Sequence, residues 1–97
     1  MFVHLVLIKL KPGVTRDDPR VPAWEAKFKG LKDKCPGIVR FEHGYNFTDR
    51  PVAYDIGINM AFDTRENLMA YGPHPAHQEV VAALREIADW IICDYEA

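Results

Sequence analysis

The segment from Phe2 to Leu10 constrains the fold more than any other part of the sequence, because it is apolar on both sides of a strand. It is rich in β-branched and large apolar residues and ends at Lys11-Pro12-Gly13, so the sequence predicts a β-strand followed by a turn. One face would carry Phe2, His4, Val6, Ile8 and Leu10, and the other Val3, Leu5 and Leu7. An antiparallel sheet with one solvated face is not apolar on both sides, so both faces of this strand need cover.

The later segments alternate between helical and strand periodicity. The predicted elements are a helix with Trp24, Phe28, Leu31 and Cys35 on one side, strands over 38–47 and 53–62, a short helix ending at Tyr71, a helix beginning at Pro75, and a strand over 90–95. This is the order β-α-β-β-α-β with an additional helical turn before the last helix. We therefore expect residues 1–97 to form a single α+β domain of ferredoxin-like type with an antiparallel sheet.

The helices of a ferredoxin-like domain cover only one face of its sheet. The second apolar face of the first strand, formed by Val3, Leu5 and Leu7, must therefore pack against another surface. A second copy of the chain supplies such a surface, and two sheets packed face to face around a twofold axis would form a dimeric α/β barrel. The predicted protein partner is the chain itself, in a homodimer.

The composition argues against several other partners. The formal net charge is −2 and both signs are mixed along the chain, so the sequence lacks the single-sign charge that binds nucleic acid or an anionic membrane. No apolar run approaches the roughly 20 residues of a membrane span. Cys35 and Cys93 are isolated, which favours reduced thiols in a cytoplasmic protein, and both are expected in the core. The sequence has no glycine motif for phosphates or dinucleotides, so no cofactor is expected.

The densest group of reactive side chains lies between the last two predicted helices, in the segment from Tyr71 to His77. His74 would be the N-cap of the last helix, and His77 would lie in its first turn, where the positive end of the helix dipole disfavours imidazolium. A neutral histidine can accept a proton. Tyr71 could donate a hydrogen bond to a substrate carbonyl and stabilise a developing enolate. His77 and Tyr71 are therefore the candidate catalytic residues.

Two other interpretations of this segment stay open. His74 and His77 can serve only to cap and pack the helix, with Tyr71 a core aromatic residue. They can also bind a divalent metal ion together with Glu79, since side chains three residues apart share a helix face. A transition-metal site usually needs three or four converging ligands, however, and the sequence shows no group that clearly completes the set, so no metal is expected.

His4 is the only polar residue on its face of the first strand. If the helices cover this face, His4 would line the same space as Trp24, Phe28 and His77. A small apolar cleft with a few converging polar groups is the usual form of a ligand site. The candidate substrate-binding residues are therefore His4, Trp24, Phe28 and His74, with a small molecule as ligand. Whether His43 faces the same cleft depends on a strand register that the sequence does not fix.

Several short motifs together resemble the stress-responsive A/B barrel family, known as Dabb domains, over nearly the full chain. They are residues 4–11, Pro36-Gly37-Ile38 with Gly44, Tyr54-Asp55, Tyr71 followed by His74-Pro75-Ala76-His77, and the terminal Asp94-Tyr95-Glu96. The resemblance implies a homodimer of ferredoxin-like subunits. This expectation agrees with the order of elements predicted from periodicity.

The resemblance also implies a chemistry. Plant polyketide cyclases of the olivetolic acid cyclase type carry out an intramolecular aldol condensation without metal or organic cofactor, using a tyrosine and a histidine that match Tyr71 and His77. His4 matches a pocket histidine of these enzymes, whereas a further pocket histidine falls at Ile56 here. We expect a cofactor-independent cyclase, isomerase or lyase acting on a small, polyketide-like carbonyl compound. The alternative is a non-catalytic dimer that responds to stress or binds a small ligand.

Overall fold

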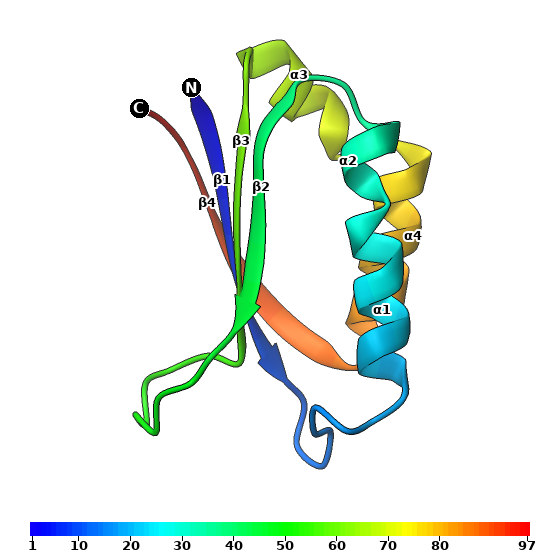
Figure 1. Cartoon of the computed structure of the whole chain (residues 1–97), viewed down its shortest axis with the longest axis vertical. Coiled ribbons are helices and arrows are strands. Elements are labelled where there is room, and N and C mark those ends of the chain that lie inside the picture. The colour runs from blue at the N-terminus through cyan, green and yellow to red at the C-terminus, as the bar shows by residue number, and fades with distance from the viewer.

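The computed structural model describes all 97 residues and contains a four-stranded antiparallel sheet with helices on one of its faces (Figure 1). In chain order the elements are β1 (Phe2–Leu10), α1 (Arg20–Lys29), α2 (Leu31–Lys34), β2 (Ile38–Tyr45), β3 (Ile56–Phe62), α3 (Arg65–Tyr71), α4 (Pro75–Arg85) and β4 (Ala88–Glu96). The strands are arranged in the order β2-β3-β1-β4. The predicted ferredoxin-like α+β fold, with an additional short helix before the last one, is confirmed.

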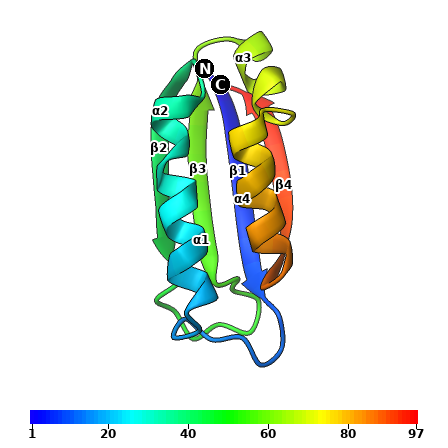
Figure 2. The same cartoon turned by 90° about the vertical axis from the view of Figure 1, so that its right-hand side faces the viewer.

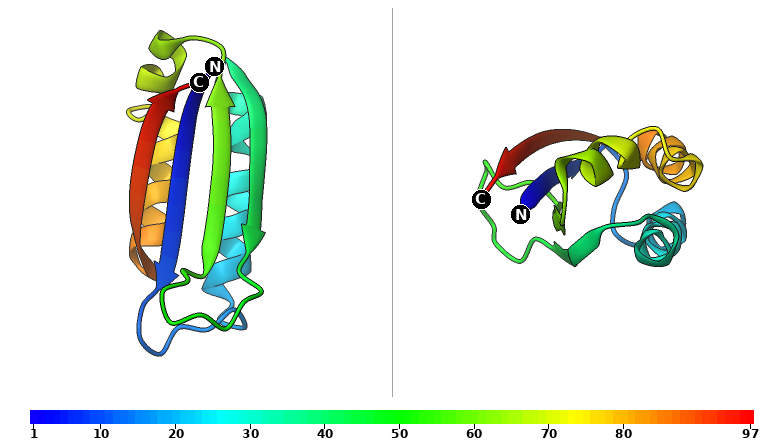
Figure 3. Two further views of the ribbon diagram at one scale, coloured as in Figure 1. Left: turned by 90° about the vertical axis from the view of Figure 1, so that its left-hand side faces the viewer. Right: turned by 90° about the horizontal axis from the view of Figure 1, so that it is seen from above.

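Two layers make up the molecule. Helices α1 and α4 run side by side along one face of the sheet, and α3 closes the end where both chain termini lie (Figure 2). The opposite face of the sheet has no helix in front of it (Figure 3, left). Every pair of neighbouring strands is antiparallel. The space between the sheet and the helices is therefore the only place where this chain forms a two-layered core.

The two faces of β1 have different surroundings, although both are apolar. Val6 and Ile8 are buried under the helices, in one hydrophobic cluster with Trp24 and Phe28. Leu7 points to the other face, where 46% of it is exposed. The prediction that the helices cover the face that carries His4 is confirmed. No helix covers the face with Leu7, which we call the outer face, although Val3 and Ala61 at one end of it are buried.

The structure differs from the predicted boundaries at two places. The predicted helix over Trp24 to Cys35 is divided at Gly30, whose N–H donates to Lys27 O three residues back and so tightens the turn between α1 and α2. Residues 46–55 form a loop and not strand ends. The loop is tied at its base, because Asn46 N–H donates to Asp55 O and Asp55 N–H donates to Ile8 O, each at 2.8 Å.

Cys93 is a correction to the prediction that both cysteines lie in the core. Cys35 is buried, but Cys93 is exposed. Its position explains the difference, since β4 is an edge strand and Cys93 lies opposite Leu5 on the outer face. No helix of the structure is long and apolar enough to cross a membrane.

Local sequence features position the helices that carry the reactive residues. The Thr64 side chain caps α3 by accepting from Asn67 N–H at 3.1 Å. Gly37, at the start of β2, has φ of 85°, and a Cβ there would lie 2.4 Å from Asn67 Nδ2. Only glycine allows both this conformation and this approach. The start of α3, and with it Tyr71 at its end, is therefore held against the sheet.

Candidate functional site

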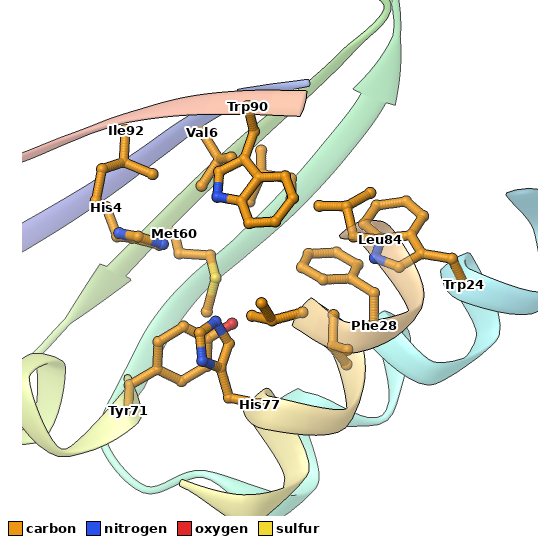
Figure 4. Close-up of a pocket in the computed structure, with 13 residues that line it drawn as sticks. His4, Val6, Trp24, Phe28, Met60, Tyr71, His77, Leu84, Trp90 and Ile92 are labelled. Carbon is orange, nitrogen blue, oxygen red and sulfur yellow. The ribbon is translucent and has the colours of Figure 1, made fainter. Parts of the chain in front are cut away.

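A cavity of about 130 Å³ lies between the sheet and the helices (Figure 4). Eleven of its 13 lining residues are hydrophobic, and none is Lys, Arg, Asp or Glu. Five of the predicted site residues line it, namely His4, Trp24, Phe28, Tyr71 and His77. They come from β1, α1, α3 and α4, so the fold brings together residues that are far apart in the sequence.

His77 lies in the first turn of α4, as the sequence predicts. Its Nδ1 is 2.9 Å from Gly72 O, and a carbonyl oxygen can only accept, so Nδ1 carries the proton and Nε2 has a free lone pair. Burial lowers the pKa of His77 from its ordinary value, and nearby His4 and His74 lower it further, while the bond to Gly72 partly opposes the shift. His77 is therefore a neutral base at neutral pH.

Tyr71 is the last residue of α3 and is only 4% exposed. Its ring lies 4.1 Å from the His77 ring and 5.3 Å from the Phe62 ring, between centroids. Burial raises the pKa of the Tyr71 phenol far above its ordinary value, so the hydroxyl remains protonated. No side chain or carbonyl of the chain shares a hydrogen bond with this hydroxyl. It is free to donate to a ligand next to His77.

His4 approaches the cavity from the sheet. Its ring meets the Tyr71 ring edge-on, with 5.8 Å between centroids, and its Nδ1 lies 2.5 Å from Asp94 Oδ1. Asp94 is the residue directly opposite His4 in the pairing of β1 with β4. Sequence reasoning missed this partner. The only available signal was that Asp94 belongs to the terminal Asp94-Tyr95-Glu96 motif, to which no role was assigned.

Aromatic side chains form the wall of the cavity farthest from Tyr71. Trp24 and Phe28 are four residues apart on α1 and stack with their centroids 5.4 Å apart, and Phe28 stacks in turn on Phe41 at 4.7 Å. Trp90 and Ile92 of β4 also line the cavity, which the sequence did not predict. Both tryptophans of the chain thus border the same space.

Comparison with known proteins gives the family. A family model described as Stress Responsive A/B Barrel Domain (Dabb) matches residues 2–97. The chain belongs to the Dabb family. An uncharacterized protein of Streptomyces coelicolor is 48% identical over 96 residues, which is 99% of each chain.

Two solved structures illustrate the range of proteins that share the fold of this Dabb domain. A protein from Jannaschia, described as dimeric and ferredoxin-like, is 26% identical, with a TM-score of 0.81 over 99% of this chain and 98% of that chain. The hydroxynitrile lyase of Passiflora edulis is 13% identical, with a TM-score of 0.82 over 97% and 90% of the two chains. The second similarity shows the fold alone. The first also links this fold to a dimer.

His74 lies apart from the cavity of the Dabb domain and does not line it. It is the predicted N-cap of α4, and its Nδ1 accepts a hydrogen bond from Ala76 N–H at 3.1 Å. This contact holds the ring against its own helix. His74 is therefore absent from the cavity that the other five predicted site residues line. Its place in the structure is that of a helix cap.

The chain has no group of three or more His, Cys, Asp or Glu side chains arranged to hold a metal ion. The Nδ1 atoms of His74 and His77 both bond to backbone groups, Ala76 N–H and Gly72 O respectively. The two histidines of the alternative metal interpretation thus each use Nδ1 for a different backbone group, and no third ligand side chain joins them.

His43 lies beside the aromatic wall and does not line the cavity. Its ring packs edge-on against Phe28, with 5.1 Å between centroids, and its Nε2 lies 2.6 Å from Glu25 Oε2. This hydrogen bond lowers the pKa of the Glu25 carboxyl. The question that the sequence left open is answered, since His43 of this Dabb domain pairs with a carboxylate on α1.

Proposed function

We propose that this Dabb protein is a cofactor-independent acid–base catalyst, a cyclase, isomerase or lyase, that acts on a small carbonyl compound. The observation that carries the proposal is that the His77 ring, with Nε2 free, lies 4.1 Å between centroids from the ring of Tyr71, whose hydroxyl has no partner, in an apolar cavity. A base with a free lone pair and a donor without a partner are the two groups that enolisation of a carbonyl compound needs.

The proposed step removes a proton from the carbon next to the carbonyl group. His77 Nε2 takes this proton, the C–H electron pair moves to form the enolate, and the Tyr71 hydroxyl donates to the enolate oxygen. Both interactions are strengthened by the apolar lining, because little water screens them. The enolate carbon then attacks a second carbonyl group in a cyclase, regains a proton at another position in an isomerase, or expels a leaving group in a lyase.

The lining of the cavity favours an uncharged substrate. No side chain there carries a fixed charge that could pair with a carboxylate, a phosphate or an ammonium group. Trp24, Phe28 and Trp90 offer aromatic faces, on which a planar or aromatic group can stack. The resemblance to plant polyketide cyclases supports ring closure. Ile56 is buried in the core at the position of their further pocket histidine, so we expect a substrate different from theirs.

Exchange of the methyl protons of acetophenone in D₂O tests the proposal, since it needs only enolisation. Proton NMR is expected to show exchange faster than in buffer, with a rate that rises with pH and becomes constant before neutrality. The base acts in its neutral form, and the lowered pKa of His77 puts the midpoint below 6.5. The raised pKa of Tyr71 predicts no fall in rate up to about pH 9.

Two outcomes would contradict this proposal. Exchange no faster than in buffer would leave the cavity as a site for binding a small ligand without chemistry. A rate that keeps rising between about pH 7 and pH 9 would mean that a group other than His77 is the base. Quenching of the two cavity tryptophans by acetophenone, measured in the same samples, shows that the compound enters the cavity.

We also propose that the chain forms a homodimer through the outer face of the sheet. Leu7 and Ile91 lie next to each other on this face and are 46% and 53% exposed. The loop over 46–55 extends to the same side of the sheet (Figure 1) and carries Phe47 and Val52, which are almost wholly exposed. Together they form an apolar surface of the kind that marks a protein interface. The dimeric relative from Jannaschia supports a second copy as the partner.

A further inference from the structure

A second acid–base group faces His77 across the cavity. His4 extends from the sheet toward Met60 and Tyr71, whereas His77 reaches the cavity from α4 (Figure 4). The Asp94 carboxylate can only accept a hydrogen bond, so the short contact between its Oδ1 and His4 Nδ1 places the imidazole proton on Nδ1. The Nε2 atom of His4 is then the one that can give a proton to a ligand, or take one from it.

The His4–Asp94 pair connects the cavity with solvent. The side chain of His4 is 12% exposed and that of Asp94 is 44% exposed, so water reaches the carboxylate but hardly reaches the imidazole. Asp94 also borders a shallow groove on the surface, together with Arg65 and Met69. Because the pair lies on the helix side of the sheet, a partner on the outer face does not cover it.

The two histidines of the cavity therefore have different partners. His77 bonds to the neutral carbonyl of Gly72 and is the base, whereas His4 bonds to a carboxylate that can stabilise an imidazolium. The contrast assigns the role of the acid to His4.

We propose that His4 is the general acid of the cavity and that Asp94 is its positioning residue, which fixes the Nδ1 proton and lets His4 regain a proton from solvent. The inference rests on the function proposed for His77 and Tyr71, and it narrows the substrate class. A general acid is needed when a hydroxyl group leaves, as it does when a β-hydroxy carbonyl compound, the product of an aldol addition, loses water.

The substrate of the proposed step is a β-hydroxy ketone. His77 Nε2 removes the proton between the two functional groups, and the enolate forms against Tyr71. The enolate electron pair then forms the C=C bond while the bond from carbon to the hydroxyl oxygen breaks. His4, protonated on both ring nitrogens before the step, gives its Nε2 proton to that oxygen, water leaves, and the His4 ring is left neutral with its proton on Nδ1. His77 afterwards loses its proton to solvent, and His4 regains one beside Asp94.

The test uses 4-hydroxy-4-phenylbutan-2-one in D₂O, because this compound reports two reactions. Proton NMR follows exchange at the carbon next to the carbonyl, which needs His77 and Tyr71 only. The absorbance of the conjugated enone follows loss of water, which needs His4 as well. Because His4 also lines the cavity, the ratio of the two rates is the test: His4→Gln and Asp94→Asn are each expected to slow loss of water about 10²-fold or more, and at least about tenfold more than they slow exchange. Tyr71→Phe is expected to slow both reactions.

The other possible results would contradict the inference, and each has its own meaning. Equal loss of both reactions in His4→Gln and Asp94→Asn would mean that the pair only supports the fold of the cavity. Unchanged loss of water, or exchange by the wild type without loss of water, would remove His4 as the acid. Absence of exchange in the wild type would instead refute the function proposed for His77 and Tyr71, and the inference with it.

A second measurement needs no substrate. Nitrogen NMR of the free protein is expected to show the neutral His4 ring with its proton on Nδ1. In Asp94→Asn the amide N–H can donate to Nδ1, so the single proton of the neutral ring should move to Nε2. The ring then has no free lone pair with which to take up the second proton that a general acid needs. A wild-type His4 that carries its proton on Nε2 would overturn the role of Asp94.

Discussion

Replacing His77 with alanine is expected to slow the exchange of acetophenone protons by about 10² to 10⁴-fold, the usual contribution of a general base. The His77 ring lies 4.1 Å from the Tyr71 ring between centroids, and its Nε2 lone pair is not used in the hydrogen bond to Gly72. Loss of the hydrogen bond to Gly72 costs about 1 kcal/mol, so the variant should remain folded. Exchange rates and the thermal midpoint are measured on the same sample.

His43→Gln is the matched control for His77→Ala. It removes another partly buried histidine that bonds to Glu25 and packs on Phe28, but it leaves the cavity lining intact. Its exchange rate should equal that of the wild type. If His77→Ala exchanged as fast as this control, His77 would be only a packing residue. His77→Gln, which retains a polar side chain of similar length, should also be inactive and distinguishes loss of the base from loss of packing.

Leu7→Arg is expected to convert the dimer to a monomer. Leu7 lies on the outer face opposite Gly57 and Ile91, so an arginine there meets the proposed partner and not the core of its own subunit. The twofold axis places two such charges in one apolar interface. We expect the dissociation constant to rise about 10³-fold or more, which corresponds to about 4 kcal/mol. Analytical ultracentrifugation measures it directly.

Met69→Arg provides the comparison for Leu7→Arg. Met69 is an exposed apolar residue on α3, 70% accessible, and it borders the groove beside Asp94 on the helix side of the sheet. The same change of side chain should there leave the dimer intact. A wild-type protein that sediments as a monomer, or equal effects of the two substitutions, would show that the outer face is not the interface.

The sequence predicted the parts of the site that depend on local pattern. The two apolar faces of β1 placed His4 under the helices, because side chains of a strand alternate. Pro75 at the start of a helix placed His74 at the N-cap and His77 one turn inside, since proline favours the first helical position. These rules act within a few residues, and they sufficed to bring His4, Tyr71 and His77 to one cavity.

The features of the site that the sequence did not predict depend on strand register and on competition between hydrogen-bond partners. The His4–Asp94 pair follows from the alignment of β1 with β4, which only the folded sheet defines. The same register places Trp90 on the cavity wall and Cys93 on the outer face, because neighbouring residues of a strand alternate. His74 was assigned to the cavity, but bonding to Ala76 N–H turns its ring onto the helix.

A crystal structure of the protein with acetophenone bound tests most directly whether this cavity is an acid–base site. We expect the ketone to lie between the aromatic wall and Tyr71, with its carbonyl oxygen accepting from the Tyr71 hydroxyl and its methyl carbon within about 3.5 Å of His77 Nε2. A ketone bound with its methyl group turned away from His77, or bound only outside the cavity, would contradict the proposed chemistry.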